Sequence, residues 1–157
     1  MSVTELEYTE AVRSAVRDRG AWLYLLLQEF KAAGYDTDEP VRKALFKFGQ
    51  MSGRKFPPVT TPAAFFEAMG GTGLKGQPFA REDMGVTAAK GVYHLHRCPL
   101  VDAWRELGAT PDEVAHLCDL AGCGDQGLIS CFPELKLQFN EMIARGDAYC
   151  EMVVTKA

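Results

Sequence analysis

The sequence predicts an α+β fold, with N-terminal helices packed on a small antiparallel β-sheet and further helices between the strands. Up to residue 70, apolar side chains recur at the spacing of amphipathic helices. From residue 86 onward, segments that alternate between apolar and polar side chains are typical of half-buried strands. A length of 157 residues, with 47% hydrophobic and 24% charged side chains, suits one domain with one core. We therefore expect a single domain, residues 1–157, made of a helical part (1–70) and a mixed part (86–157).

Three helices are expected in the helical part. The first spans residues 4–33, where leucines have helical spacing and Gly34 is a stop signal; Gly20 could divide it. The second begins at Asp38, a capping residue that is followed by a proline suited to a first turn. A short third helix follows Thr61 and ends at the next glycine pair.

The mixed part is expected to hold three strands and two helices. Alternation predicts strands over residues 91–97, 134–144 and 148–154. One helix is predicted over 100–107, and another begins at the capping box formed by Thr110 and Glu113. Two glycine-rich segments, 70–85 and GCGDQG at 122–127, are expected to be loops. Long loops in compact domains often carry function.

Composition and charge argue against several classes of protein. The formal net charge of −4, without a clustered basic stripe, argues against nucleic-acid binding. The longest apolar run, residues 21–27, is about a third of the length that a membrane span needs. The acidic N-terminus does not resemble a signal peptide, so we expect a cytoplasmic protein. In that compartment the five cysteines stay reduced, which favours chemistry, a metal or burial over disulfides.

The segment GVYHLHRCPL, residues 91–100, concentrates residues that carry chemistry. On a strand, His94, His96 and Cys98 share one face, and the more apolar Tyr93 and Leu95 face the core. Histidines two residues apart on a strand are about 7 Å apart at Cα, so both imidazoles can reach one metal ion. A divalent metal is therefore one candidate cofactor. Its candidate ligands are His94, His96, Cys98, Cys118 and Cys150.

Cys98 is also a candidate nucleophile. We expect it beside His96 and just before a helix, and both an imidazole and a helix N-terminus stabilise a thiolate. This predicts a lowered pKa for Cys98, which would make it the most reactive thiol of the chain, with His96 as the nearest base. Cys118 lies on an apolar helix stripe, where a cysteine is more often a core residue. His116 lies off that stripe and is expected at the surface.

Several short motifs in the mixed part occur in the order found in one known family. They are HRCPLVDAWRELGAT at 96–110, then Cys118, Asp125, the Phe132–Pro133 pair, and GDAYCEMVV at 146–154, with GQMSGRKF at 49–56 upstream. In this order and spacing, the chain resembles the L-2-amino-thiazoline-4-carboxylate hydrolase-like family over roughly residues 35–155. The resemblance implies that Cys98, Cys118, Asp125 and Cys150 belong to one pocket.

The activity that the resemblance implies is the hydrolytic opening of a cyclic thiazoline amino acid to N-carbamoyl-L-cysteine. In such a reaction, water or a thiolate attacks the amidine-like ring carbon, and an acid or a metal assists the leaving nitrogen or sulfur. The chain is then a hydrolase of non-peptide C–N or C–S bonds. The catalytic candidates are Cys98, His96, Cys118 and Asp125. The candidates for substrate binding are His94, Cys150 and Trp104.

Two other functions stay open at this point. The closing Gly-Asp-x-x-Cys strand is also similar to small-molecule-binding domains of the 4-vinyl reductase type. In that case Phe65, Phe66 and Trp104 would line an apolar ligand site, and there would be no catalysis. Alternatively, the long first helix is a surface for self-association, and a homo-oligomer is then expected. For the hydrolase and the binding domain alike, the expected partner is a small molecule and neither nucleic acid nor a membrane.

Overall fold

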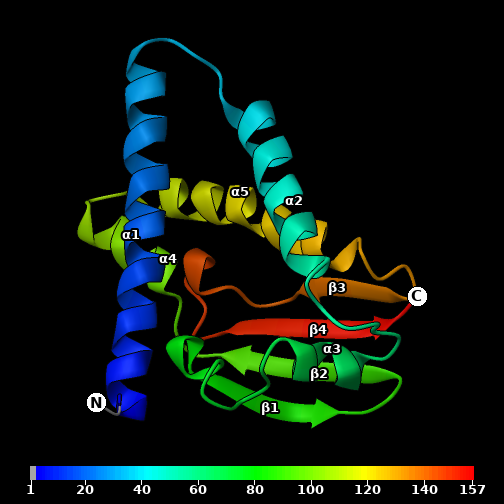
Figure 1. The fold of residues 1–157 in the computed structure, drawn as a ribbon. Coiled ribbons are helices and arrows are strands. Elements are labelled where there is room, and N and C mark those ends of the chain that lie inside the picture. The colour runs from blue at the N-terminus through cyan, green and yellow to red at the C-terminus, as the bar shows by residue number, and fades with distance from the viewer. Residues whose placement is uncertain (1–2) are drawn as a thin grey trace.

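The computed structural model describes residues 3–157, and within them five α-helices and a four-stranded antiparallel sheet confirm the predicted α+β class (Figure 1). The helices are α1 (Glu5–Ala32), α2 (Asp38–Gly53), α3 (Pro62–Ala68), α4 (Pro99–Glu106) and α5 (Pro111–Ile129), with 3₁₀ turns η1 (Gln77–Phe79) and η2 (Ile143–Arg145). The strands are β1 (Arg81–Val86), β2 (Lys90–Leu95), β3 (Leu135–Phe139) and β4 (Cys150–Lys156). They are ordered β1-β2-β4-β3 in the sheet.

Two helix starts follow the capping signals in the sequence, whereas the predicted cap at Asp38 was wrong, because Asp38 is the first residue of α2 and its N-cap, Thr37, makes no side-chain hydrogen bond. Thr61 accepts a hydrogen bond from the amide of Ala64 at the start of α3, and Thr110 with Glu113 forms a capping box at the start of α5. The possible break at Gly20 does not occur, since α1 is continuous through it. A Cβ at Gly20 would lie 3.2 Å from the Leu100 side chain, so the glycine lets α1 approach α4 closely.

Two segments expected as loops are regular, and both expectations were wrong. Strand β1 occupies residues 81–86, where charged, exposed residues at the sheet edge leave no apolar alternation to detect. Residues 122–127 are helical and belong to α5. Two of their glycines, Gly124 and Gly127, lie where α5 crosses α2: a Cβ at Gly127 would lie 2.8 Å from the carbonyl carbon of Phe46, and a Cβ at Gly49 of α2 would lie 2.7 Å from the amide nitrogen of Leu128. Close packing of α5 on α2 therefore explains Gly124 and Gly127 but not Gly122.

The predicted strands are present with shifted ends. Strand β2 ends at Leu95 and not at residue 97, because the chain turns there into α4. Strand β3 ends at Phe139 and not at 144, and η2 follows it. The last strand runs to Lys156.

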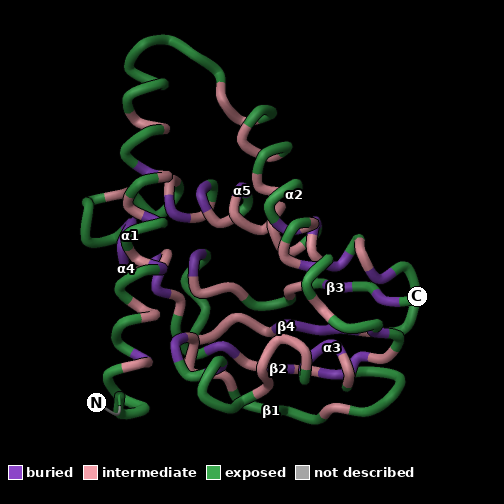
Figure 2. The backbone as a smooth tube through the Cα atoms, viewed as in Figure 1, coloured by how far each residue is buried: buried purple, intermediate pink, exposed green. Residues whose placement is uncertain are grey.

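The core consists of two clusters of buried side chains. Figure 2 marks the buried positions along the backbone, with stretches in β2, β4 and α5. The sheet cluster packs one face of the sheet against α3 and the end of α5, and it includes Phe65, Phe66, Tyr93, Leu95 and Phe132. The predicted core face of β2 is thus confirmed, and Phe66 stacks on Tyr93 with centroids 4.1 Å apart. The helix cluster joins α1, α4 and α5 and consists of Tyr24, Val101, Trp104, Val114, Leu117 and Ala144.

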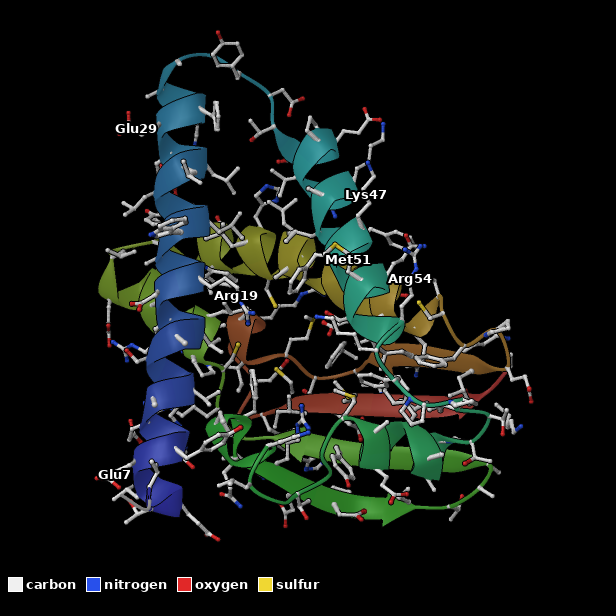
Figure 3. All side chains as sticks on the ribbon, in the orientation of Figure 1. Glu7, Arg19, Glu29, Lys47, Met51 and Arg54 are labelled. Carbon is white, nitrogen blue, oxygen red and sulfur yellow. The ribbon has the colours of Figure 1, made fainter. Side chains whose placement is uncertain are left out.

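Helix α1 is covered on one side only. Trp22, Leu26 and Phe30 on its uncovered side are 76%, 55% and 47% exposed. In Figure 3, Arg19 extends from α1 toward α2, where its guanidinium carbon lies 5.9 Å from the Phe48 ring centroid. Within residues 3–157, no helix is long and apolar enough to cross a membrane. A homo-oligomer stays a prediction.

Candidate functional site

Three of the predicted site cysteines come from three elements and lie where the two core clusters meet. Cys98 immediately precedes α4, Cys118 is on α5, and both pack against the helix cluster. Cys150 begins β4 and packs against the sheet cluster. Its Sγ accepts a hydrogen bond of 3.3 Å from the amide of Ile143, a residue that packs against the helix cluster. All three thiols are free.

The thiols share one electrostatic environment. Burial raises the pKa of Cys98 to about 11, and the neighbouring Cys150 adds to the rise. Burial also raises the pKa of Cys118 to about 12, with further contributions from Cys98 and Cys150. Effects of this kind act between groups that are near each other, so the structure brings the three sulfur atoms into one region. At neutral pH these groups are neutral thiols.

The predicted lowering of the Cys98 pKa is therefore wrong. The backbone amides of Val101 and Leu100 do lower it, as expected at the start of a helix, but burial has the larger effect. The predicted imidazole partner is engaged elsewhere, since His96 Nε2 lies 2.7 Å from Glu82 Oε2. A thiolate at Cys98 is therefore not stabilised by an imidazole, contrary to what the sequence pattern had suggested.

Asp125 belongs to the same region. It follows Cys118 by seven residues on α5, which is close to two helical turns and places both side chains on one face. Burial raises the pKa of Asp125 to about 6, and the guanidinium of Arg81 opposes part of this rise. A carboxylic acid with this pKa exchanges protons readily near neutral pH, as a general acid or base requires.

Arg81 is a site residue that the sequence reasoning missed. It begins β1 opposite Leu95, and its Nη1 donates to the carbonyl oxygens of Met69 (2.9 Å) and Gly71 (3.5 Å). Its Nε is buried without a hydrogen-bond partner. An unsatisfied buried donor costs about 1–3 kcal/mol unless a ligand accepts from it. No sequence signal singled out Arg81, because it lies in a segment that we expected to be a loop.

The two histidines lie on the other face of the sheet. Strand β2 directs Tyr93 and Leu95 into the core and His94 away from it. His94 stacks on Tyr149 with ring centroids 3.9 Å apart, and its Nε2 lies 3.8 Å from Glu151 Oε1. The predicted common face of His94, His96 and Cys98 is wrong for Cys98, because β2 ends at Leu95 and the chain then turns into the core.

The candidate metal ligands are likewise split between the outer face of the sheet and the core. Within residues 3–157, the one group of three or more ligand side chains whose donor atoms all lie within 4.8 Å of one another is Glu82, His94 and His96. The predicted ligands Cys98, Cys118 and Cys150 do not form such a group.

Trp104 and the two phenylalanines are packing residues. Trp104 is 0% exposed, and its Nε1 donates a hydrogen bond of 2.9 Å to the carbonyl oxygen of Gly20. Phe65 and Phe66 are equally enclosed in the sheet cluster. His116 is exposed, as predicted, and its Nε2 lies 3.0 Å from Asp38 Oδ1.

The fold and this region define an α+β protein with three thiols where its two core clusters meet, and with Asp125 and Arg81 in their electrostatic surroundings. The family model described as L-2-amino-thiazoline-4-carboxylic acid hydrolase matches residues 14–154, and the chain belongs to this family. No curated protein and no solved structure matched the chain.

Proposed function

We propose that the chain hydrolyses a small cyclic amidine-like substrate of the 2-amino-thiazoline-4-carboxylate type. The observation that carries the proposal is the nearness of two groups: Arg81, whose buried Nε has no partner, and Asp125, whose pKa is raised to about 6 by burial and is lowered in part by the Arg81 charge. Such a substrate has one group that can bind to Arg81 and another that can react beside Asp125. Its carboxylate suits a guanidinium, and its amidine-like ring carbon and nitrogens suit a carboxylate. Membership of the hydrolase family supports the same reaction.

In the proposed mechanism water is the nucleophile and Asp125 moves the protons. The water oxygen bonds to the ring carbon while the Asp125 carboxylate takes one water proton and passes it to the ring nitrogen. The C–S bond then breaks, its electron pair goes to sulfur, and the remaining hydroxyl proton moves through Asp125 to that sulfur. The product is an N-carbamoyl cysteine with a free thiol. General acid–base catalysis of this kind contributes about 10²–10⁴-fold.

The cysteines act as neutral groups in this mechanism. Thiols with pKa values of about 11 and 12 are poor nucleophiles at neutral pH, because the thiolate is the reactive form. Neutral Cys98 and Cys118 suit the surroundings of the ring sulfur, since S–H groups are weak donors and polarisable. His96 has no part in the proton transfers, because it pairs with Glu82.

The experiment is a product analysis with the purified wild-type chain. L-2-Amino-thiazoline-4-carboxylate is incubated with the protein, thiol release is followed with a chromogenic disulfide reagent, and the product is identified by mass spectrometry. We expect one free thiol per substrate consumed and the mass of the substrate plus one water. A decarboxylated analogue, 2-amino-thiazoline, should react at least 10²-fold more slowly, because it lacks the group that Arg81 binds.

Two outcomes would contradict the proposal. The first is the absence of turnover of any 2-amino-thiazoline, with or without a carboxylate. If a thiazoline binds without being consumed, the small-molecule-binding alternative is correct instead. The second is a covalent adduct on Cys98 or Cys118 that forms and decays at the turnover rate, which would make a cysteine and not water the nucleophile.

A further inference from the structure

Polar side chains form a row across three strands on the face of the sheet that points away from the core. In the strand register, Glu82 of β1 lies opposite His94 of β2, and His94 lies opposite Glu151 of β4. His96 follows on the same face, with its ring centroid 6.1 Å from that of His94 and its Nε2 2.7 Å from Glu82 Oε2. The row gathers two imidazoles and two carboxylates at one place.

The spacing of these donor atoms suits a single metal ion. Those of Glu82, His94 and His96 all lie within 4.8 Å of one another. Two ligand atoms that are each about 2.1 Å from one Zn²⁺ ion lie at most ~4.2 Å apart, so side-chain movements of under ~1 Å bring the set onto an ion. The side chains of His96 and Glu82 are 43% and 57% exposed, which gives an ion access from solvent.

Neighbouring side chains hold part of this set in position. Tyr149 stacks on the His94 ring, and Asn140 Nδ2 donates a hydrogen bond of 2.7 Å to Glu151 Oε2. Contacts of this kind fix the orientation of a ligand before the ion binds and strengthen binding. The Glu151 carboxylate, 3.8 Å from His94 Nε2, neighbours the three donor groups without belonging to the group whose atoms lie within 4.8 Å of one another.

A surface histidine beside a carboxylate does not by itself bind metal. His116 and Asp38, 3.0 Å apart, form such a pair with a single imidazole. The row on the sheet differs because a second imidazole shares the carboxylate. The His116 pair is therefore a natural control for the row.

We propose that Glu82, His94 and His96 bind one divalent transition-metal ion of the zinc class. Two imidazoles and carboxylate oxygen suit Zn²⁺, and they also suit Co²⁺. The ion joins β1 to β2 at the residue next to Arg81, and it stabilises an edge strand whose register shifts between Asp83 and Val86. This site is on the opposite face of the sheet from Asp125 and the thiols and is independent of the proposed hydrolysis.

The test is metal binding by the untagged full chain. Zn²⁺ binding is measured by competition with a chromogenic chelator, and Co²⁺ binding by absorption, for the wild type, Glu82→Gln, His96→Gln and His116→Gln. We expect one equivalent bound by the wild type and by His116→Gln, and affinity at least tenfold lower in the other two variants. The Co²⁺ complex should lack the intense near-ultraviolet band of thiolate ligands.

Three outcomes would overturn the proposal: no saturable binding, binding that Glu82→Gln and His96→Gln leave unchanged, or a thiolate band, which would place the ion at the cysteines. Circular dichroism and thermal melting of each variant separate a lost site from a lost fold. His96 and Glu82 are exposed, so both substitutions should leave the fold intact.

Discussion

Asp125 is the residue on which the proposed chemistry depends. It combines a pKa raised by burial with a nearby guanidinium that limits the rise. A general base works best when its pKa is near the working pH, and a value of about 6 leaves Asp125 mostly ionised at neutral pH. Cys118 and Asp125 could be named from sequence, because the resemblance supplied both, but their common helix face could not, because residues 122–127 were expected to form a loop. Arg81 could not be identified, because β1 has no apolar alternation and only the fold brings it beside α5.

The pH dependence of turnover should report on Asp125. Since the carboxylate is the active form, kcat/KM should be constant above the pKa and fall about tenfold per unit as the pH drops below about 6. Arg81→Gln removes a positive charge that lowers this pKa, so the fall should begin at higher pH. Arg81→Lys keeps the charge and should keep the wild-type profile while raising KM. If the pH dependence of kcat/KM were the same in the wild type and in both variants, Arg81 would have no influence on the pKa of Asp125.

Thiol labelling should rank the cysteines in the reverse of the order that the sequence predicted. A rise of the Cys98 pKa from 9.0 to about 11 reduces its thiolate fraction about 100-fold, and burial limits access further. Limited iodoacetamide labelling at pH 8, read by peptide mass spectrometry, should modify Cys123 faster than Cys98 or Cys118. Labelling of Cys98 first would restore the nucleophile interpretation.

At the scale of elements, the crossing of α2 and α5 fixes where Asp125 and Cys118 lie. Gly49 and Gly127 are buried at this crossing, and a Cβ at either would press on the backbone of the other helix. The caps at Thr61 and Thr110 and the core face of β2 could be predicted, because each depends on local sequence. The helical state of residues 122–127 could not, because Gly124 and Gly127, which favour a loop locally, are required here by packing against α2, a helix far away in the sequence.

Gly49→Ala should therefore destabilise the protein by roughly 1–3 kcal/mol, because one helix must move away from the other. Gly122→Ala on α5 is the matched control, since nothing lies within 4 Å of its Cβ position. It should stabilise the helix by up to about 1 kcal/mol. Urea denaturation followed by circular dichroism measures both, and equal effects of the two substitutions would refute close packing at the crossing.

At the scale of the whole molecule, one carboxyl group affects stability and the proposed activity in opposite ways: protonated Asp125 favours the folded state, whereas the proposed reaction needs the carboxylate. The folded pKa of Asp125, about 6, exceeds the ordinary value of 3.8, so the folded state holds this proton more firmly than the unfolded state does. Its contribution to stability is complete below about pH 3.8 and is lost as the pH rises through about 6. Functional sites often carry a cost of this kind.

Asp125 is half-buried as a residue, so replacing it with Asn should stabilise the fold at pH 7.5 by roughly 1–2 kcal/mol, which is less than the full pKa shift implies. The difference from the wild type should shrink toward zero as the pH approaches 4. Urea unfolding of both proteins at pH 7.5 and pH 4 measures this. A variant that is less stable than the wild type at pH 7.5 would mean that the carboxylate supports the fold.

The most direct measurement is kcat/KM of Asp125→Asn with L-2-amino-thiazoline-4-carboxylate at pH 7.5, beside Asp112→Asn as a control. Asp112 is exposed in the first turn of the same helix. We predict that Asp125→Asn lowers kcat/KM by 10² or more while folding normally, and that Asp112→Asn stays within about threefold of the wild type. Turnover by Asp125→Asn at the wild-type rate would contradict the assignment of this cluster as the hydrolytic site.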